Sequence, residues 1–94
     1  MKHLLLNIPV SIFREEGAYI AHTPVLDLST CADSIEGVRR RFGEAVQIFF
    51  AELERKGTTG EVLESLGWQK VENQWSAPIE VAHEIEHIEV PIGA

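Results

Sequence analysis

Cysteine is almost missing from this sequence: Cys31 is the only one, so no disulfide can form within one chain. Small proteins without disulfides are typical of a reducing compartment, and we therefore expect a cytoplasmic protein. Basic residues are also scarce, with 8 Lys and Arg against 15 Asp and Glu and a net charge of −7. Because phosphate contacts need an excess of basic groups, direct DNA binding by this chain alone is not expected. The negative charge suits a basic partner instead.

Long apolar runs are missing as well. The N-terminal apolar segment is interrupted at Asn7 and Pro9, which makes it too short for a signal peptide or a membrane-spanning helix. We therefore expect no membrane association. The 94 residues, 45% of them hydrophobic, suffice for one globular domain, but its core is small. Self-association as a homodimer or larger oligomer is expected, because it buries additional apolar surface.

Three β-strands are predicted in the first third of the chain. Residues 3–13 are rich in Leu, Ile and Val, and the alternation of Ile8, Val10 and Ile12 with other residues indicates a strand, which Pro9 limits to an edge or a bulge. A polar turn at residues 14–17 leads into a second strand at 18–22, so the two strands are expected to form a hairpin. Residues 28–32 are predicted to form a short third strand.

The strongest pattern in the sequence is a helical stripe that begins at residue 35. Asp33 and Ser34 offer side-chain oxygens as N-caps, and Gly57 ends the segment. Apolar residues recur three or four positions apart, which predicts an amphipathic helix of about six turns. The stripe consists of Ile35, Val38, Phe42, Ala45, Val46, Phe49 and Leu53. We expect this stripe to pack against one face of a small antiparallel sheet, in a two-layer α+β fold.

The last third is less regular. Residues 61–66 are predicted to form a short helix, and residues 68–75 to form a strand, a turn near Asn73 and a returning strand. Residues 79–94 contain acidic residues but no Lys or Arg, and their alternation at 88–92 favours a final edge strand. The expected organisation is an α+β domain at 1–78 followed by an acidic tail at 79–94. We expect residues 85–92 of this tail to pair with a neighbouring subunit.

Two patterns suggest chemistry, and both have a commoner structural explanation. Residues 83–87 match H-E-x-x-H, which binds zinc when it lies on a helix and a third ligand is present. Only seven residues follow, and β-branched residues and prolines surround the motif, so an exposed or strand-borne histidine pair is favoured over a metalloprotease. Cys31 could approach His22, but no activating group is adjacent, and a small buried hydrophobe is the expected role. We expect no catalytic, metal or cofactor site, and no enzyme.

The arginine run and the two tryptophans also have structural explanations. Arg39, Arg40 and Arg41 occupy successive helical positions that span about 200°, so they cannot all face one phosphate strip. A solvated helix face is favoured. Trp68 and Trp75 flank the predicted strand–turn–strand. They are expected to pack in the core or in an oligomer contact.

Three short motifs occur in an order that resembles a known family. They are Gly17-Ala18-Tyr19-Ile20-Ala21, then Thr23-Pro24-Val25-Leu26, then the segment from Thr30 to Val38 that opens the long helix. In this order and spacing they resemble the HicB family, the antitoxin partners of HicA-type toxins. The resemblance covers residues 5–57, and extends more loosely to Trp75.

The resemblance implies a partial ribonuclease-H-like fold, β-β-β-α-β, without a nuclease site. It also implies a small basic HicA-like ribonuclease as partner, which the antitoxin neutralises by covering its active surface. An orphan HicB-like interaction module without a toxin partner is the alternative. This chain departs from the family at the helix entry, which has Ala32-Asp33-Ser34 and Glu36-Gly37-Val38 where the family usually has glycine and alanine. Residues 76–94 are also too short and too acidic for the C-terminal DNA-binding domain that many family members carry.

Overall fold

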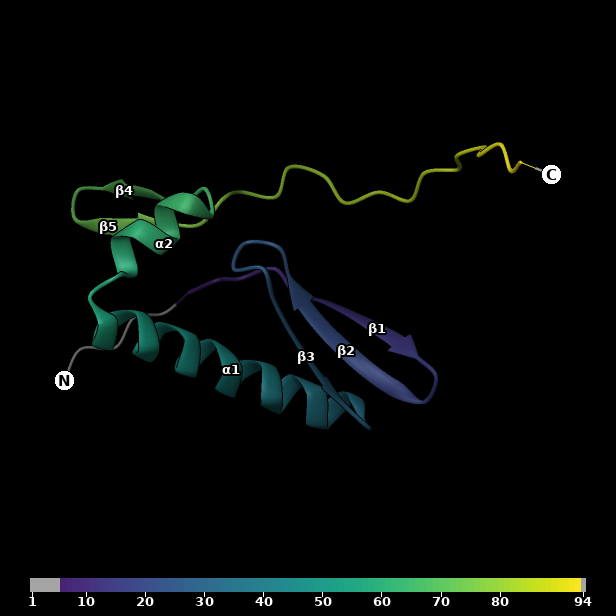
Figure 1. Ribbon diagram of the computed structural model, residues 1–94, viewed down its shortest axis with the longest axis horizontal. Coiled ribbons are helices and arrows are strands. Elements are labelled where there is room, and N and C mark those ends of the chain that lie inside the picture. Colours follow the sequence, from purple (N-terminus) through teal and green to yellow (C-terminus); the bar gives the residue numbers. More distant parts are fainter. Residues whose placement is uncertain (1–5, 94) are drawn as a thin grey trace.

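The computed structural model describes residues 6–93 and shows an α+β fold (Figure 1). Three antiparallel strands, β1 (Ser11–Glu15), β2 (Ala18–Thr23) and β3 (Leu28–Ala32), form a sheet in the order β1-β2-β3. They are followed by α1 (Ile35–Lys56), α2 (Thr59–Ser65), and a separate hairpin of β4 (Gln69–Val71) and β5 (Gln74–Ser76). No helix within residues 6–93 has the length and apolarity that a membrane crossing requires.

The β1–β2 hairpin follows from its turn residues. Glu16 and Gly17 both have positive φ, of 46° and 82°, as a two-residue hairpin turn requires. The register pairs Ser11 with His22, so continuing the ladder backwards would place Pro9 opposite Pro24. Neither proline has an N–H group, and the pairing therefore stops. The strand predicted from residue 3 is consequently wrong over residues 6–10, which are irregular, and residues 3–5 lie outside the described residues.

The long helix begins and ends where the sequence predicts. Ser34 has an extended backbone, and its Oγ accepts a hydrogen bond from the Gly37 N–H at 3.0 Å. At the other end Gly57 adopts a left-handed conformation with φ 68°, and its N–H group bonds to helical carbonyls. These are the usual solutions for the free backbone groups at helix ends.

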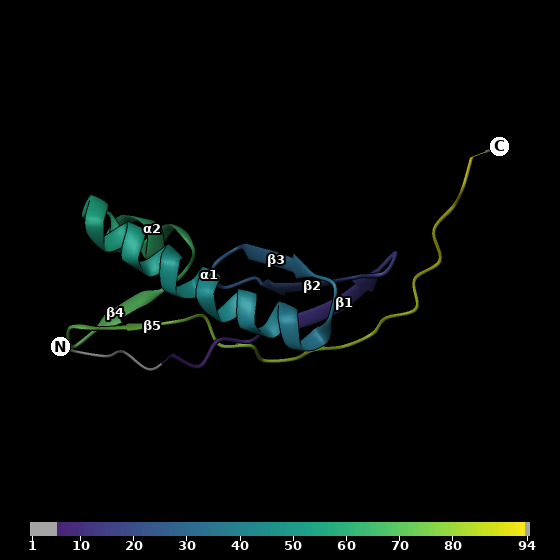
Figure 2. The same cartoon turned by 90° about the horizontal axis from the view of Figure 1, so that it is seen from below.

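The apolar stripe of α1 serves two different packing partners. Its first half lies against β3 and β2, and Val38 of α1 and Ala21 of β2 are both buried. Its second half contributes Leu53 to a cluster with α2 and the loop after β2. The buried members of that cluster are Val25, Leu26, Leu53, Leu63 and Trp68. Figure 2 shows α1 over one face of the sheet, with β3 and β1 at opposite edges.

One hydrogen bond joins the two halves of the chain in this core. The Nε1–H of Trp68 donates to the backbone carbonyl of Val25 at 2.7 Å, across 43 positions of sequence. Trp68 also lies edge-on to Phe50, with ring centroids 6.1 Å apart. The buried Val25 carbonyl lies in an irregular loop, where no neighbouring strand donates to it, and the indole N–H of Trp68 satisfies it instead.

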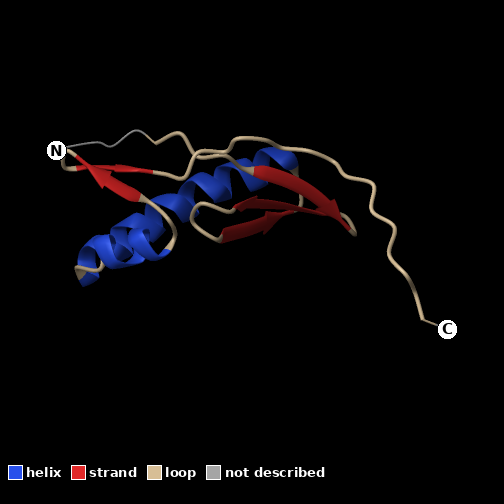
Figure 3. Ribbon diagram, turned by 90° about the horizontal axis from the view of Figure 1, so that it is seen from above, coloured by secondary structure: helices blue, strands red, loops and turns tan. Residues whose placement is uncertain are grey.

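The C-terminal third differs from the sequence prediction in three ways. Helix α2 starts at Thr59, two positions before the expected residue 61, and the β4–β5 hairpin does not join the main sheet as the β-β-β-α-β order implied. The strand predicted at 88–92 is also wrong, since residues 77–93 contain neither helix nor strand. An isolated edge strand needs a partner to satisfy its backbone, and the single chain supplies none there. Figure 3 shows this segment leaving the body as a loop.

Candidate protein-binding surfaces

The face of the sheet that points away from α1 carries an apolar row. Phe13 pairs with Ile20, and Ile20 pairs with Cys31. Side chains alternate along a strand, and Ala21 and Thr23 point inward and are buried, so this row points outward. Phe13 is 56% exposed and Cys31 is exposed. We call this row, with its neighbours Ser11, His22 and Ser29, the open sheet face.

Cys31 does not have the predicted role. It was expected to be a small buried hydrophobe, but it is exposed, because its position in β3 points to the open sheet face. Its carbonyl accepts a hydrogen bond from Nη1 of Arg41 at 3.0 Å. His22, the predicted neighbour of Cys31, instead bonds through Nδ1 to Ser29 Oγ at 2.7 Å.

The His22–Ser29 pair places an imidazole next to a hydroxyl, which are two of the groups that a serine nucleophile requires. A serine nucleophile needs its base to be oriented by a third group, together with donors for the developing oxyanion. Within residues 6–93 no carboxylate is hydrogen-bonded to His22. The pair lies on the open sheet face and not among the residues that line a pocket. The observed geometry is that of a cross-strand polar pair.

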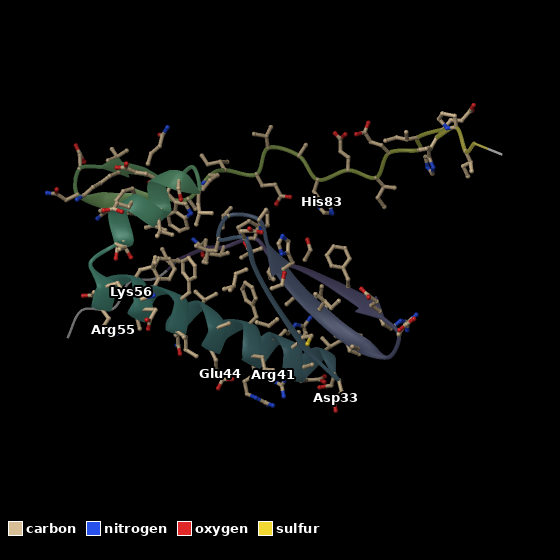
Figure 4. All side chains as sticks on the ribbon, viewed as in Figure 1. Asp33, Arg41, Glu44, Arg55, Lys56 and His83 are labelled. Atoms are coloured by element: carbon tan, nitrogen blue, oxygen red, sulfur yellow. The ribbon has the colours of Figure 1, made fainter. Side chains whose placement is uncertain are left out.

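The arginine run is solvated, as expected. Arg39, Arg40 and Arg41 are all exposed, and in the part of the chain that the structure describes only Arg41 makes a side-chain hydrogen bond, to the Cys31 carbonyl near the end of β3. Figure 4 shows Arg41 at the beginning of α1, at the same end of the molecule as Asp33. Acidic and basic groups are therefore mixed at this end, and the arrangement does not form a continuous basic strip for phosphates.

The H-E-x-x-H residues do not lie on a helix. His83 and His87 belong to the extended segment after Ser76, and both are exposed. Nδ1 of His83 lies 3.4 Å from Oε1 of Glu80 (His83 is labelled in Figure 4). Over the described part of the chain, no three His, Cys, Asp or Glu side chains gather to hold a metal ion. A zinc site of the metalloprotease type requires the helical spacing that is missing here.

An apolar groove of about 610 Å³ lies between the segment before β1 and a flank of α1 that includes part of its apolar stripe. Leu6, Ile8 and Val10 form one wall, and Phe42, Val46 and Phe50 of α1 form the other. Trp75 also lines the groove. The sequence pattern did not reveal the groove, because the α1 stripe was expected to face the sheet along its whole length. The remaining lining residues are Gly43, Gln47, Glu54 and Thr59.

The two tryptophans divide between core and surface. Trp68 is 3% exposed and belongs to the core cluster. Trp75 is half-buried at the groove, and Nζ of Lys70 lies 5.8 Å from its ring centroid, within range of a cation–π contact. The expectation of core packing is therefore confirmed for Trp68. Trp75 keeps an accessible side at the groove.

The segment 77–93, which we call the arm, is the most exposed part of the molecule. It carries six apolar side chains that are 68–93% exposed. They are Ile79, Val81, Ile85, Ile88, Val90 and Ile92. Its four glutamates, Glu80, Glu84, Glu86 and Glu89, have no Lys or Arg among the arm residues to balance them. The arm thus combines apolar side chains with uncompensated negative charge.

One carboxyl group has a perturbed pKa. The hydrogen bonds from Arg55 are the main cause that lowers the pKa of Glu52. Desolvation opposes them, and the positive charge and hydrogen bond of Lys56 lower the pKa further. All three side chains are exposed. Exposed pairs of this kind within one helix contribute little to stability, and they do not point to a reaction centre.

Comparison with known proteins gave no match: no family model, no curated protein and no solved structure matches this chain.

Proposed function

We propose that this chain is a non-catalytic cytoplasmic protein-binding module, a HicB-like antitoxin with a partial ribonuclease-H-like fold. Its partner would be a small basic HicA-like ribonuclease, whose active surface the chain covers. The single observation that carries the binding role is the open sheet face, an apolar row next to a polar row on an uncovered sheet. Exposed aromatic and apolar side chains that cluster with a polar rim are typical of protein interfaces.

The structural roles of the resembling motifs support the family proposal. The first motif turns the β1–β2 hairpin through Gly17 and continues into β2. The second places Val25 and Leu26 in the core. The third contains the end of β3 and the Ser34 cap of α1. Each motif therefore contributes to the β-β-β-α unit that the resemblance implies.

The charge supports a basic partner. The chain carries a net charge of −7, and opposite charges on two proteins accelerate their encounter. The association rate constant should therefore fall steeply from low to high salt, because ions screen this attraction. An association rate constant that does not change with salt would contradict the charge argument.

The test is a pull-down with the tagged full-length chain from its native cells, using wild type and two variants. Phe13→Glu places a charge in the apolar row of the open sheet face, on its β1 edge. Val71→Glu is the matched control, because Val71 is 55% exposed on the β4–β5 hairpin, away from that face. We expect wild type and Val71→Glu to retain one small basic protein in near-equal amount. Phe13→Glu should lose it.

The captured protein is then purified and assayed for RNA cleavage. We expect cleavage to stop when one equivalent of wild-type chain is added, and to continue with Phe13→Glu. Equal retention by wild type and Phe13→Glu would refute the open sheet face as the binding site. A partner without ribonuclease activity, or no partner at all, would refute the antitoxin role and favour the orphan module.

A further inference from the structure

The arm and the groove are both apolar surfaces without a partner within residues 6–93. The groove has walls of Leu, Ile, Val and Phe side chains. The arm exposes six β-branched residues to solvent. Groups of exposed apolar side chains such as these are uncommon on monomeric proteins, and they mark sites of association.

Beyond His83 the arm does not pack on its own body, and the shape of the molecule reflects this. The radius of gyration is 16.4 Å, whereas a compact chain of this length has about 12 Å. The first arm residues lie near Pro9 and Pro24, where Glu80 and His83 line a shallow pocket. Beyond them the arm runs past the sheet and carries the C-terminus away from it (Figures 1 and 3).

The sequence of the arm prevents a simple return to the groove of the same chain. The arm leaves the body directly after Trp75, which lines that groove, so its distal residues would have to reverse direction to reach it. Reversals use Gly, Pro, Asn, Asp or Ser. None of these occurs between Pro78 and Pro91. An extended segment of this composition reaches outward, at about 3.3 Å per residue.

We infer that the arm docks in the apolar groove of a second copy of this chain, and that the two copies exchange arms reciprocally. Ile88, Val90 and Ile92 alternate along the extended arm and therefore share one side. This side enters the groove between Val10 and Val46 of the other copy. In a two-fold dimer, the arm of each copy covers the groove of the other copy, so both arms and both grooves are covered at once. A single chain cannot do this, because its arm would have to reverse direction to reach its own groove.

The size of the contact suits a stable dimer. Residues 81–92 of the arm and the eleven residues that line the groove make 23 residues in each copy. A standard protein interface uses about 20–30 residues on each side. The composition is also suitable, since β-branched side chains meet aromatic and aliphatic ones.

The charges predict that dimerisation depends on salt in the opposite way from the proposed binding of a basic partner. Each copy carries a net charge of −7, so two copies repel each other. Salt screens this repulsion, and the dimer should become tighter as salt is added. Binding of a basic protein at the open sheet face should instead weaken with salt. The two associations can therefore be tested and refuted independently.

The first experiment measures the mass of the full chain by sedimentation equilibrium over a concentration series, at low and high salt. We expect a dimer in wild type, and weakening on the order of a hundredfold or more in Val90→Asp, since a buried β-branched side chain becomes a charge. Ile85→Asp is the matched control: Ile85 is 86% exposed on the same arm but on the opposite side of the extended chain. A monomeric wild type, or equal dissociation by both variants, would overturn the exchange.

A second experiment determines whether the groove is filled by the arm of the same chain or by the arm of a second copy. In a Cys31→Ser background, one chain carries Val90→Cys, and a second chain with a size tag carries Val10→Cys. A short bismaleimide cross-linker should join the two different chains in a mixture. A third chain that carries both cysteines should also give dimers. Cross-links confined within single double-cysteine chains would show that each arm fills its own groove, and would refute the exchange. Phe13→Asp should leave the cross-linking unchanged, because it alters only the open sheet face.

Discussion

Replacing Trp68 with phenylalanine tests the hydrogen bond that joins the two halves of the chain. The indole donates its only N–H to the Val25 carbonyl at 2.7 Å, and the side chain is 3% exposed. Phenylalanine keeps most of the apolar contact with Phe50 but cannot donate. The Val25 carbonyl is then left buried without its partner, and the smaller ring leaves a void.

The magnitude follows from these two losses. An unsatisfied buried carbonyl costs about 1–3 kcal/mol, and the void left by a smaller ring adds to that cost. A chain of 94 residues has roughly 5–14 kcal/mol of stability in total. A loss of about 2–3 kcal/mol should therefore lower the melting temperature by roughly 10–20 °C.

The assay is guanidinium and thermal unfolding followed by far-ultraviolet circular dichroism, which reports α1 independently of the tryptophan signal. Trp75→Phe is the control, because Trp75 is only half-buried and its indole has no hydrogen bond within residues 6–93. The control should lose less than about 1 kcal/mol. If Trp68→Phe changed the free energy of unfolding by less than about 0.5 kcal/mol, the hydrogen bond would not join the two halves as described.

Three further changes test other parts of the fold. Thr23→Val should leave the free energy of unfolding equal or raise it, because the Thr23 hydroxyl is fully buried and has no hydrogen-bond partner within residues 6–93; a clear loss in denaturant unfolding would reveal a partner for that hydroxyl. Ser34→Ala should cost about 1 kcal/mol in the same assay through loss of the bond to Gly37 N–H, and an unchanged midpoint would contradict the cap. The pKa of Glu52, lowered mainly by Arg55, should rise in Arg55→Ala, as followed by carbon NMR titration. Because that pKa is lower in the folded state, its contribution to stability is present above the unfolded pKa and is lost as the pH falls through the folded value; an unchanged pKa in the variant would refute the assignment to Arg55.

Features that depend on neighbouring residues were predicted correctly from the sequence. The α1 boundaries follow from Ser34 and Gly57, whose side chain and conformational freedom satisfy the free backbone groups at the helix ends. The third strand, residues 28–32, was also located correctly. A cap or a tight turn is decided within a few residues, and the sequence therefore contains the whole cause.

Features that depend on distant partners were predicted less well. The alternation at residues 6–10 is that of a strand, yet no strand forms there, because Pro24 ends the only neighbouring strand opposite Pro9. The alternation at 88–92 likewise has no partner within one chain. A strand pattern shows which side chains can share a face, but pairing needs a second backbone to supply hydrogen bonds.

The candidate surfaces also divide into features that neighbouring residues determine and features that depend on distant partners. The sequence by itself determined a small acidic α+β chain, its long capped helix and the acidic composition of residues 79–94. Only the tertiary structure decided that α1 lies over β3 and β2 and leaves part of its apolar stripe open as a groove, that Cys31 points outward, and that Trp68 reaches Val25. Periodicity fixes which residues share a face of a helix or strand, but the packing of one element on another decides which part of that face is covered.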